Sequence, residues 1–422
     1  MSVILQSGKA RRLYCIARAG NFLTDSMTKK QTKDKTSTAA ENRDPSITAR
    51  YFEQRGGETL ETIRQLVEME SPSDNKEAVD RLGESLARKF SELGGRVRFH
   101  RTAKFGDHLQ VDFAARDDRK PVLLLGHMDT VYPIGTLATM PCRVADGRLW
   151  GPGTLDMKSG IGLMLHSIEA LRARNGESRR SVTVLLVSDE EVGSDSSRHI
   201  TEELAKKSEA VLVLEPAYGL QGSVKTARKG VGKYSLKVSG IAAHSGLDFE
   251  KGQSAILELA LQIAKIAEFT DVKRGLTLNV GLVQGGTRVN VVAAEATATI
   301  DVRIARMKDA SGIDRKLRSL RPFNRKCKLE ISGGLNRPPM ERTAGVAALY
   351  GKATQIAKQL GWRLGEAAVG GGSDGNFTAG LGIPTLDGLG GVGEGAHANH
   401  ESILISELPR RAALLAELIE AV

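Results

Sequence analysis

Three continuous apolar runs stand out in the first half of the chain. They are PVLLLGH at 121–127, VTVLLV at 182–187 and AVLVLEP at 210–216. Such runs are typical of strands buried on both faces, as in a sheet covered by helices. Helical periodicity lies between and after them, at about 158–174 and 196–206. This alternation of strands and helices predicts an α/β layered domain.

Two amphipathic helices are expected ahead of these runs. The segment ETLETIRQLVEMESPS predicts a helix that ends at the Ser71-Pro72 turn, because the residue before a proline disfavours helical backbone. Residues 76–93 predict a second helix, closed by Gly94-Gly95. The segments RVRFHRT and HLQVDFAA then predict strands that join the same sheet.

The pattern changes near Arg228, where apolar and polar positions begin to alternate. GKYSLKVSG, LTLNVGLVQGG, EATATIDVRIA and KCKLEISGG predict four strands, with helices at 254–269 and about 309–320 between them. The resulting β-α-β-β-α-β order is typical of a small ferredoxin-like α+β domain. From Arg337 onward the chain returns to helices and glycine-rich loops, which indicates that the first domain resumes there.

The predicted organisation is therefore one α/β domain split by an inserted domain. We expect the α/β domain to comprise 47–227 and 337–422, and the inserted domain to comprise 228–336. Residues 1–46 are polar and rich in Lys and Thr over their second half, so we expect a disordered N-terminal tail.

Composition narrows the class of protein. The net charge is +10, but residues 1–50 hold 10 Lys/Arg against 4 Asp/Glu, so most of the excess lies in the tail. No basic stripe carries interleaved aromatic residues, so we expect no nucleic-acid binding. No apolar stretch approaches the roughly 20 residues of a membrane-spanning helix, so we expect no membrane partner.

The three cysteines and the N-terminus bear on location. The cysteines are widely spaced and form no CxxC pair, which fits a reducing compartment. The first 26 residues have a basic element but no sustained apolar stretch, unlike a secretory signal, and Met27 is an alternative start. We therefore expect a cytoplasmic protein.

Acidic and imidazole side chains gather where the predicted strands end. His127 and Asp129 follow the first apolar run, and residues two apart on an extended chain point to the same side. His127 could face a metal while Asp129 orients its other ring nitrogen; a local His-Asp hydrogen bond is the structural alternative. Asp156 lies in the glycine-rich turn GPGTLDMKSG, where it could bridge two metal ions or simply cap a helix.

Further carboxylates follow the second and third runs. Glu190 and Glu191 are adjacent and repel each other unless a cation or a proton relieves them. Because adjacent side chains diverge, one could bind metal while the other holds a water; a solvated acidic turn is the alternative. Glu215 ends the third run in the same way, and His397 lies in the loop GVGEGAHANHES, where His400 is expected to be a surface residue.

Together these residues predict a metal centre. A set rich in carboxylates and poor in imidazoles suits two Zn²⁺ ions that share one carboxylate bridge. Such a centre would activate a bound water to attack an amide carbonyl, with a free glutamate as the base. Co²⁺ or Mn²⁺ could substitute, because these ligands do not select sharply among the metals.

An ordered series of motifs resembles a known family. GHMDTV, GPGTLDMKSG, the DEE-x-GS run, LEP, AHSG, GGTRVNVV, DVRIAR, NRPPM and GGGSDGNF are similar to motifs of the M20 metallopeptidases, and most closely to their glutamate carboxypeptidase branch. The similarity covers roughly residues 55–420, in order. The resemblance implies a zinc-exopeptidase-like α/β catalytic domain, which would correspond to 47–227 and 337–422, and an inserted dimerisation (lid) domain at 228–336.

The resemblance also implies which residues hold zinc. His127, Asp156 and Glu215 would hold one ion, and Asp156, Glu191 and His397 the other, with Asp156 as the bridge.

It further implies how the reaction proceeds. Glu190 would be the general base that activates a water bridging the two zinc ions and then protonates the leaving amine. Asp129 would orient His127. The peptide bond after Asp156 is expected to be cis.

Residues outside the metal centre are expected to bind substrate. By resemblance, His244 would reach into a partner subunit's active site to stabilise the oxyanion, and Asn290 would polarise the same carbonyl. Arg337 would grip a free carboxylate of the substrate through its guanidinium fork, with Ser373 nearby. A homodimer formed through the inserted domain is therefore expected.

Two departures from the family pattern concern specificity. The segment after AHSG contains LDFEKG where relatives carry a proline, and NRPPM stands where some relatives have GRPAF. Both concern the substrate pocket rather than the metal ligands. The sequence does not specify the acyl group.

The functional hypothesis is a zinc-dependent exopeptidase that cleaves the amide bond to an amino acid with a free carboxylate, such as C-terminal glutamate. An N-acyl-amino-acid deacylase or dipeptidase of the same family is the nearest alternative. A non-catalytic zinc-binding protein on this scaffold would have lost a ligand or the base, whereas all seven residues of the predicted centre are present.

Overall fold

The computed structural model describes residues 45–115, 118–175 and 180–422. The expected disordered tail therefore lies almost entirely outside the described residues. The first helix, α1, spans Pro45–Val67. It begins 13 residues before the helical pattern predicted, since proline suits a first helical turn and Thr48 and Phe52 supply additional buried contacts. No helix among the described residues is both long and apolar enough to cross a membrane.

A six-stranded sheet forms the centre of the α/β domain, in the order β1-β2-β6-β3-β7-β14. Its strands are β1 (Arg96–His100), β2 (His108–Phe113), β3 (Val122–His127), β6 (Val182–Val187), β7 (Ala210–Val213) and β14 (Thr385–Leu386). The three predicted apolar runs are the neighbouring parallel strands β6, β3 and β7, and all their residues are buried. The prediction of a doubly covered sheet is thus confirmed.

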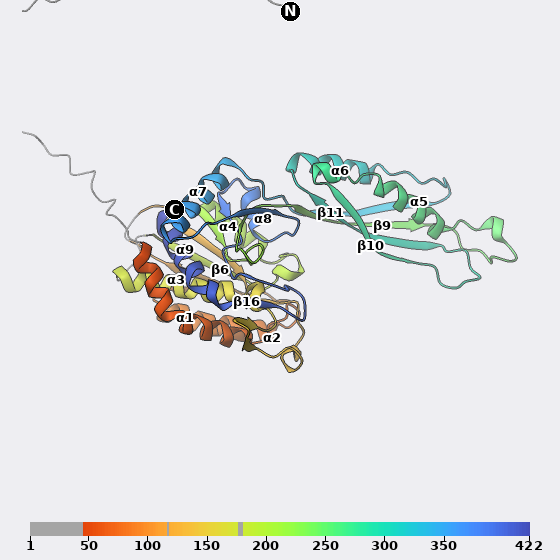
Figure 1. Cartoon of the computed structure of the whole chain (residues 1–422). Coiled ribbons are helices and arrows are strands. Elements are labelled where there is room, and N and C mark those ends of the chain that lie inside the picture. Colours follow the sequence, from red (N-terminus) through yellow and green to blue (C-terminus); the bar gives the residue numbers. More distant parts are fainter. Residues whose placement is uncertain (1–44, 116–117, 176–179) are drawn as a thin grey trace, which may run out of the picture. The chain divides into compact units, whose positions relative to one another are not determined.

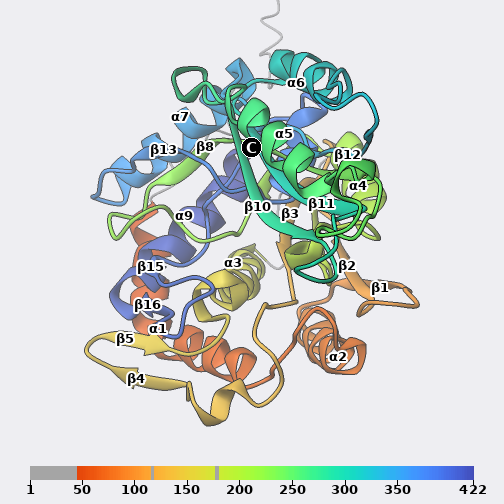
Figure 2. The same ribbon diagram turned by 90° about the vertical axis from the view of Figure 1, so that its right-hand side faces the viewer.

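Helices cover both faces of this sheet. On one face lie α1, α2 (Lys76–Glu92), α3 (Ser159–Asn175) and α9 (Leu408–Ala421), which share the main apolar core. Figure 2 shows α1, α3 and α9 next to one another, as their mutual contacts require. On the other face, a smaller core forms between the sheet and α4 (Arg198–Lys207). The helix α8 (Gly375–Gly380) packs against α4, β7 and β14, and α7 (Ala344–Gln359) packs against α9.

Register places the ends of three strands at one edge. His127 pairs with Val187, and Leu125 pairs with Val213. The residues that follow β6 and β7 therefore leave the sheet beside His127. Ligands collect at such carboxyl edges in open α/β sheets.

The inserted domain has its own sheet and core. Its strands are β9 (Gly230–Ser239), β10 (Thr277–Gly285), β11 (Glu295–Ile304) and β12 (Lys328–Arg337), all antiparallel to their neighbours in the order β10-β11-β9-β12. The helices α5 (Ala255–Ala267) and α6 (Ala310–Arg318) lie on one face, as Figure 1 shows. The chain order β-α-β-β-α-β and the sheet order both agree with the predicted ferredoxin-like class.

Two small sheets position loops of the α/β domain. In one, β15 (Gly393–Glu394), β16 (Ser402–Leu404), β5 (Arg148–Trp150) and β4 (Arg143–Ala145) lie side by side. Ser402 pairs with Trp150, so the loop that carries His397 runs beside the loop that carries Asp156. In the other, β8 (Val224–Arg228) pairs in parallel with β13 (Glu366–Val369).

Candidate active site

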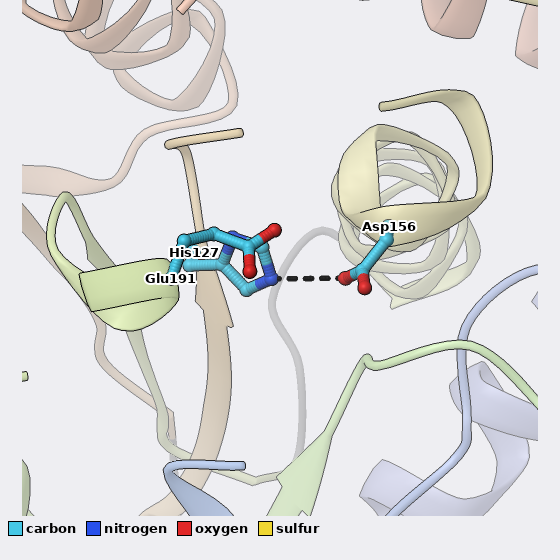
Figure 3. A group of neighbouring side chains, drawn as sticks. All are labelled: His127, Asp156 and Glu191. Atoms are coloured by element: carbon cyan, nitrogen blue, oxygen red, sulfur yellow. Dashed lines mark hydrogen bonds and ion pairs between the residues drawn. The ribbon is translucent and has the colours of Figure 1, made fainter. Parts of the chain in front are cut away.

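His127 ends β3 with its ring almost completely buried. Its Nε2 lies 3.1 Å from Asp156 Oδ1 and 3.5 Å from Glu215 Oε1. Figure 3 shows the contact between this ring and the Asp156 carboxylate. Its Nδ1 donates a hydrogen bond to the backbone carbonyl of Asp129 at 2.9 Å. This hydrogen bond fixes the tautomer that leaves Nε2 free to bind a metal.

Asp129 contacts the His127 ring and also the turn that follows β6. Its carboxylate Oδ1 lies 3.5 Å from the His127 ring, and the closer acceptor is its main-chain oxygen. The carboxylate accepts a hydrogen bond from the Ser73 hydroxyl at 2.7 Å and faces the backbone N–H groups of Glu190 and Glu191 at 3.3 and 3.2 Å. Asp129 therefore fixes the acidic turn after β6 as well as the imidazole.

Asp156 lies between two histidines. Oδ1 faces His127 and Oδ2 lies 3.4 Å from His397 Nε2, so each carboxylate oxygen has its own partner. The backbone around Asp156 is not helical, at φ −114° and ψ 94°, and the peptide bond to Met157 is cis, as expected. One carboxylate thus contacts both imidazoles of the cluster.

Glu190 and Glu191 diverge, as adjacent side chains must. They belong to the turn Glu190–Val192 after β6. Glu191 Oε1 lies 3.0 Å from His397 Nε2, whereas Glu190 Oε1 accepts a hydrogen bond from Arg337 at 2.8 Å. Burial raises the pKa of Glu190 well above its usual range, although the Arg337 guanidinium opposes this shift. A buried glutamate of raised basicity suits a proton acceptor.

Glu215 is held from behind by a buried ion pair. Arg228 donates to Glu215 Oε2 at 3.2 Å and, through two nitrogens, to both oxygens of Asp387 at 2.8 Å. Burial lowers the pKa of Arg228, but the charges of Asp387 and Glu215 outweigh it and raise the pKa overall. The sequence analysis missed Arg228 and Asp387. The only signal was the ARKG segment at 227–230, where the pattern changes at the predicted start of the inserted domain.

The donor set fits divalent cations. Two groups of ligand atoms lie within 4.8 Å of one another among the described residues, His127/Asp156/Glu191 and His127/Glu190/Glu215. The carboxylates draw positive charge into the cluster. Hydrogen bonds with Asp156 and Glu191 raise the pKa of His397 to about 10. Burial lowers the pKa of His127, but hydrogen bonds with the surrounding carboxyl groups raise it overall.

Arg337 and Ser373 are more enclosed than expected. The Arg337 side chain is 8% exposed, and its Nη2 donates to Glu190, Ser194 and Asp374. Ser373 is fully buried and donates to Asp387 at 2.6 Å, so its hydroxyl braces the partner of Arg228. The contact of Ser373 with a substrate carboxylate stays a prediction, and in this structure its hydroxyl is buried and hydrogen-bonded to Asp387.

His244 and Asn290 lie together on the inserted domain. Both are exposed, and the N–H of Ser245 donates to the Asn290 carbonyl at 3.0 Å. Gly246 N–H donates to His244 Nδ1, which leaves Nε2 as the outward nitrogen. Among the described residues, no hydrogen bond or ion pair joins either side chain to the metal-binding cluster.

The sequence of this chain is similar to those of known proteins. The model of peptidase family M20/M25/M40 matches residues 123–421. The chain belongs to this family. Carboxypeptidase G2 of Pseudomonas sp. (strain RS-16) is 31% identical over 369 residues, 85% of this chain and 88% of that relative. A succinyl-diaminopimelate desuccinylase of Dechloromonas aromatica is 29% identical, over 73% of this chain and 85% of its own.

Solved structures show the same fold. An aminopeptidase of Bacillus cereus superposes with a TM-score of 0.73 at 24% identity, covering 86% of this chain and 98% of that one. An M20 family metallo-carboxypeptidase of Sulfolobus solfataricus superposes with a TM-score of 0.69 at 18% identity, covering 86% and 98%. This M20 metallopeptidase therefore has a two-domain α/β fold with an inserted domain, and is a hydrolase of peptide or amide bonds.

Proposed function

We propose that this M20 enzyme is a two-zinc exopeptidase that releases an amino acid bearing a free carboxylate. The observation that carries the proposal is Asp156, whose two oxygens face His127 and His397 separately. His127, Asp156 and Glu215 would hold one ion, and Asp156, Glu191 and His397 the other. Co²⁺ or Mn²⁺ would fit the same donors.

Glu190 is the proposed general base. Zinc bound at this centre would polarise the substrate carbonyl and lower the pKa of water. Glu190 takes the proton of the attacking water and then delivers it to the leaving nitrogen. Its position supports this role, because a Glu190 oxygen lies within 4.8 Å of ligand atoms of His127 and Glu215. Hydrogen bonds to Asp129 and Arg337 hold its N–H and its carboxylate.

Arg337 is the proposed binding site for the substrate's carboxylate, but its guanidinium also pairs with carboxylates of the protein. Its Nη2 already contacts Glu190 and Asp374, so a substrate carboxylate must compete with them or join them. Arg337→Lys should therefore raise KM, because an ammonium cannot offer a fork to two acceptors. A fall in kcat with unchanged KM would instead indicate that Arg337 only positions Glu190 and does not bind the substrate.

A homodimer would complete the site through His244 and Asn290. The strand β9 begins at Gly230, beside Arg337, and its ten residues span roughly 30 Å before the His244 turn. That length separates His244 from the metal-binding cluster of its own chain. The inserted domain also exposes apolar side chains at Ile256 and Leu257 on α5 and at Leu282 on the edge strand β10, which support a protein partner.

A second candidate is an N-acyl-amino-acid deacylase. The similarity to succinyl-diaminopimelate desuccinylases favours it, since those relatives are named for removal of an acyl group. The same residues would perform the chemistry, and only the acyl side of the pocket would differ.

A substrate panel on zinc-loaded protein tests the proposal. It should compare N-acyl glutamates, acetylated amino acids, N-succinyl amino acids and dipeptides, each with its carboxyl-amidated counterpart. We expect hydrolysis only where the released amino acid has a free carboxylate. Equal rates on amidated counterparts would refute the exopeptidase assignment, and preference for succinyl substrates would select the deacylase.

A further inference from the structure

Glu401 is a fully buried carboxylate next to the proposed metal centre, and the mechanism above does not use it. It follows His397 by four residues in the same loop. Its Oε1 accepts hydrogen bonds from the backbone N–H groups of Leu155 at 2.7 Å and Asp156 at 2.9 Å. Its Oε2 accepts from the N–H of Gly153 at 3.2 Å and the hydroxyl of Tyr132 at 2.6 Å.

These four donors rule out a ligand role for Glu401. Each oxygen accepts two hydrogen bonds, so neither keeps a lone pair directed at an ion. Three of the donors are consecutive or near-consecutive N–H groups of the loop that carries Asp156. That loop adopts non-helical backbone angles at Asp156, so its N–H groups have no helical acceptor there. Glu401 supplies the acceptor that this backbone conformation requires.

Tyr132 connects the loop that follows His127 to the loop that carries His397 and Glu401. Its hydroxyl lies 2.9 Å from the carbonyl of Ala398, the residue after His397, as well as 2.6 Å from Glu401. Tyr132 itself follows His127 by five residues along the loop that leaves β3. His397 has a left-handed backbone with φ +63°, a conformation that non-glycine residues adopt only when their surroundings hold them there.

We propose that Tyr132 and Glu401 form a positioning pair that holds the Asp156 and His397 loops in register before metal binds. Their hydrogen bonds go to main-chain groups and to each other, not to a proposed metal-ligand atom. The pair thus holds the main chain that carries Asp156 and His397. Hydrogen bonds behind metal ligands commonly contribute about 10–100-fold in metal affinity. The proposal rests on the two-zinc function above.

Glu401→Gln and Tyr132→Phe test the pair with little change in shape. In Glu401→Gln, an amide NH₂ replaces one oxygen and is directed at donors in either orientation, so at least one N–H or O–H loses its acceptor. Tyr132→Phe removes only the hydroxyl. Two matched controls lie elsewhere in the chain. Glu258 is buried in the inserted domain and accepts hydrogen bonds from two backbone N–H groups. The hydroxyl of Tyr350 donates a hydrogen bond to a backbone carbonyl.

The measurement is zinc affinity and stoichiometry of the full-length protein, by competition with a chromophoric chelator. For Glu401→Gln we expect the weaker-bound ion to bind about 10–100-fold less tightly, and for Tyr132→Phe up to about tenfold, with activity recovered as zinc is raised. Glu258→Gln and Tyr350→Phe should bind both ions as the wild type does.

The outcomes separate this proposal from the function on which it rests. Wild-type affinity for both ions in Glu401→Gln and Tyr132→Phe would overturn the positioning role while leaving the two-zinc function intact. Equal losses in the two controls would overturn it as well, since the effect would then be general. A wild-type protein that binds fewer than two zinc ions would overturn both.

Discussion

Replacing Arg228 by Lys should destabilise the catalytic domain strongly. Arg228 is buried, at 4% side-chain exposure, and pairs with Asp387, at 0%, and Glu215, at 9%. Its five hydrogen bonds comprise three to these carboxylates and two to the carbonyls of Gly371 and Gly372. A lysine keeps the charge but offers at most three donors from one atom, so it cannot serve both carboxylates and both carbonyls.

The magnitude follows from the bonds lost. At least two charge-assisted hydrogen bonds disappear, each contributing about 1.5–3 kcal/mol, so we expect the free energy of unfolding to fall by about 3–6 kcal/mol. Equilibrium urea unfolding of the metal-free protein measures it. Trp150 and Trp362 are the only tryptophans and both belong to the catalytic domain, so their fluorescence reports this transition.

Arg342→Lys is the matched control. Arg342 makes a two-pronged pair with Glu366 at 2.7 and 3.0 Å, but both side chains are partly exposed to solvent. Solvent screening should leave the unfolding midpoint of Arg342→Lys nearly unchanged. Equal shifts of the unfolding midpoint in the two variants would contradict the inference that burial makes the Arg228 ion pairs more stabilising than the exposed Arg342 pair.

Three further predictions concern packing, assembly and metal. Gly160→Ala should lower the free energy of unfolding by at least about 1–3 kcal/mol, since its Cβ would collide with the Leu214 carbonyl. Gly312 lies in open space on α6, so Gly312→Ala should raise the free energy of unfolding by about 0.5–1 kcal/mol. A higher melting temperature for Gly160→Ala than for Gly312→Ala would contradict this. His244→Ala and Glu190→Gln should each be inactive. Subunit exchange between the two variants should restore about a quarter of wild-type activity, because half of the dimers then hold one complete site. If exchange is verified and no activity returns, His244 does not act across subunits. Chelation should abolish hydrolysis and two equivalents of zinc should restore it; full activity at one equivalent would contradict a two-ion site.

The sequence predicted the features that have a periodic or local signature. The runs at 121–127, 182–187 and 210–216 identified buried parallel strands, and acids just beyond such strands must meet at one edge of the sheet. Alternation after Arg228 likewise identified the inserted domain.

What escaped prediction are contacts between residues far apart in the chain. Arg228 and Asp387 are 159 positions apart, and Glu401 meets Asp156 across 245. No local pattern distinguishes such residues from surface charges. The hydrogen bond from Ser373 to Asp387 escaped prediction for the same reason, since the motif around Ser373 pointed only to a substrate contact.

The central claim is that Glu190 is the general base of a two-zinc site. The most direct test is to measure the hydrolysis rate of the Glu190→Gln variant together with its zinc content. The rate should be measured on the best substrate of the panel, at saturating zinc. We expect two zinc ions per chain, as in the wild type, and a kcat lower by about 10²–10⁴-fold, because only the proton acceptor has been removed. A fully zinc-loaded Glu190→Gln protein with kcat near the wild-type value would contradict the assignment of Glu190 as the base.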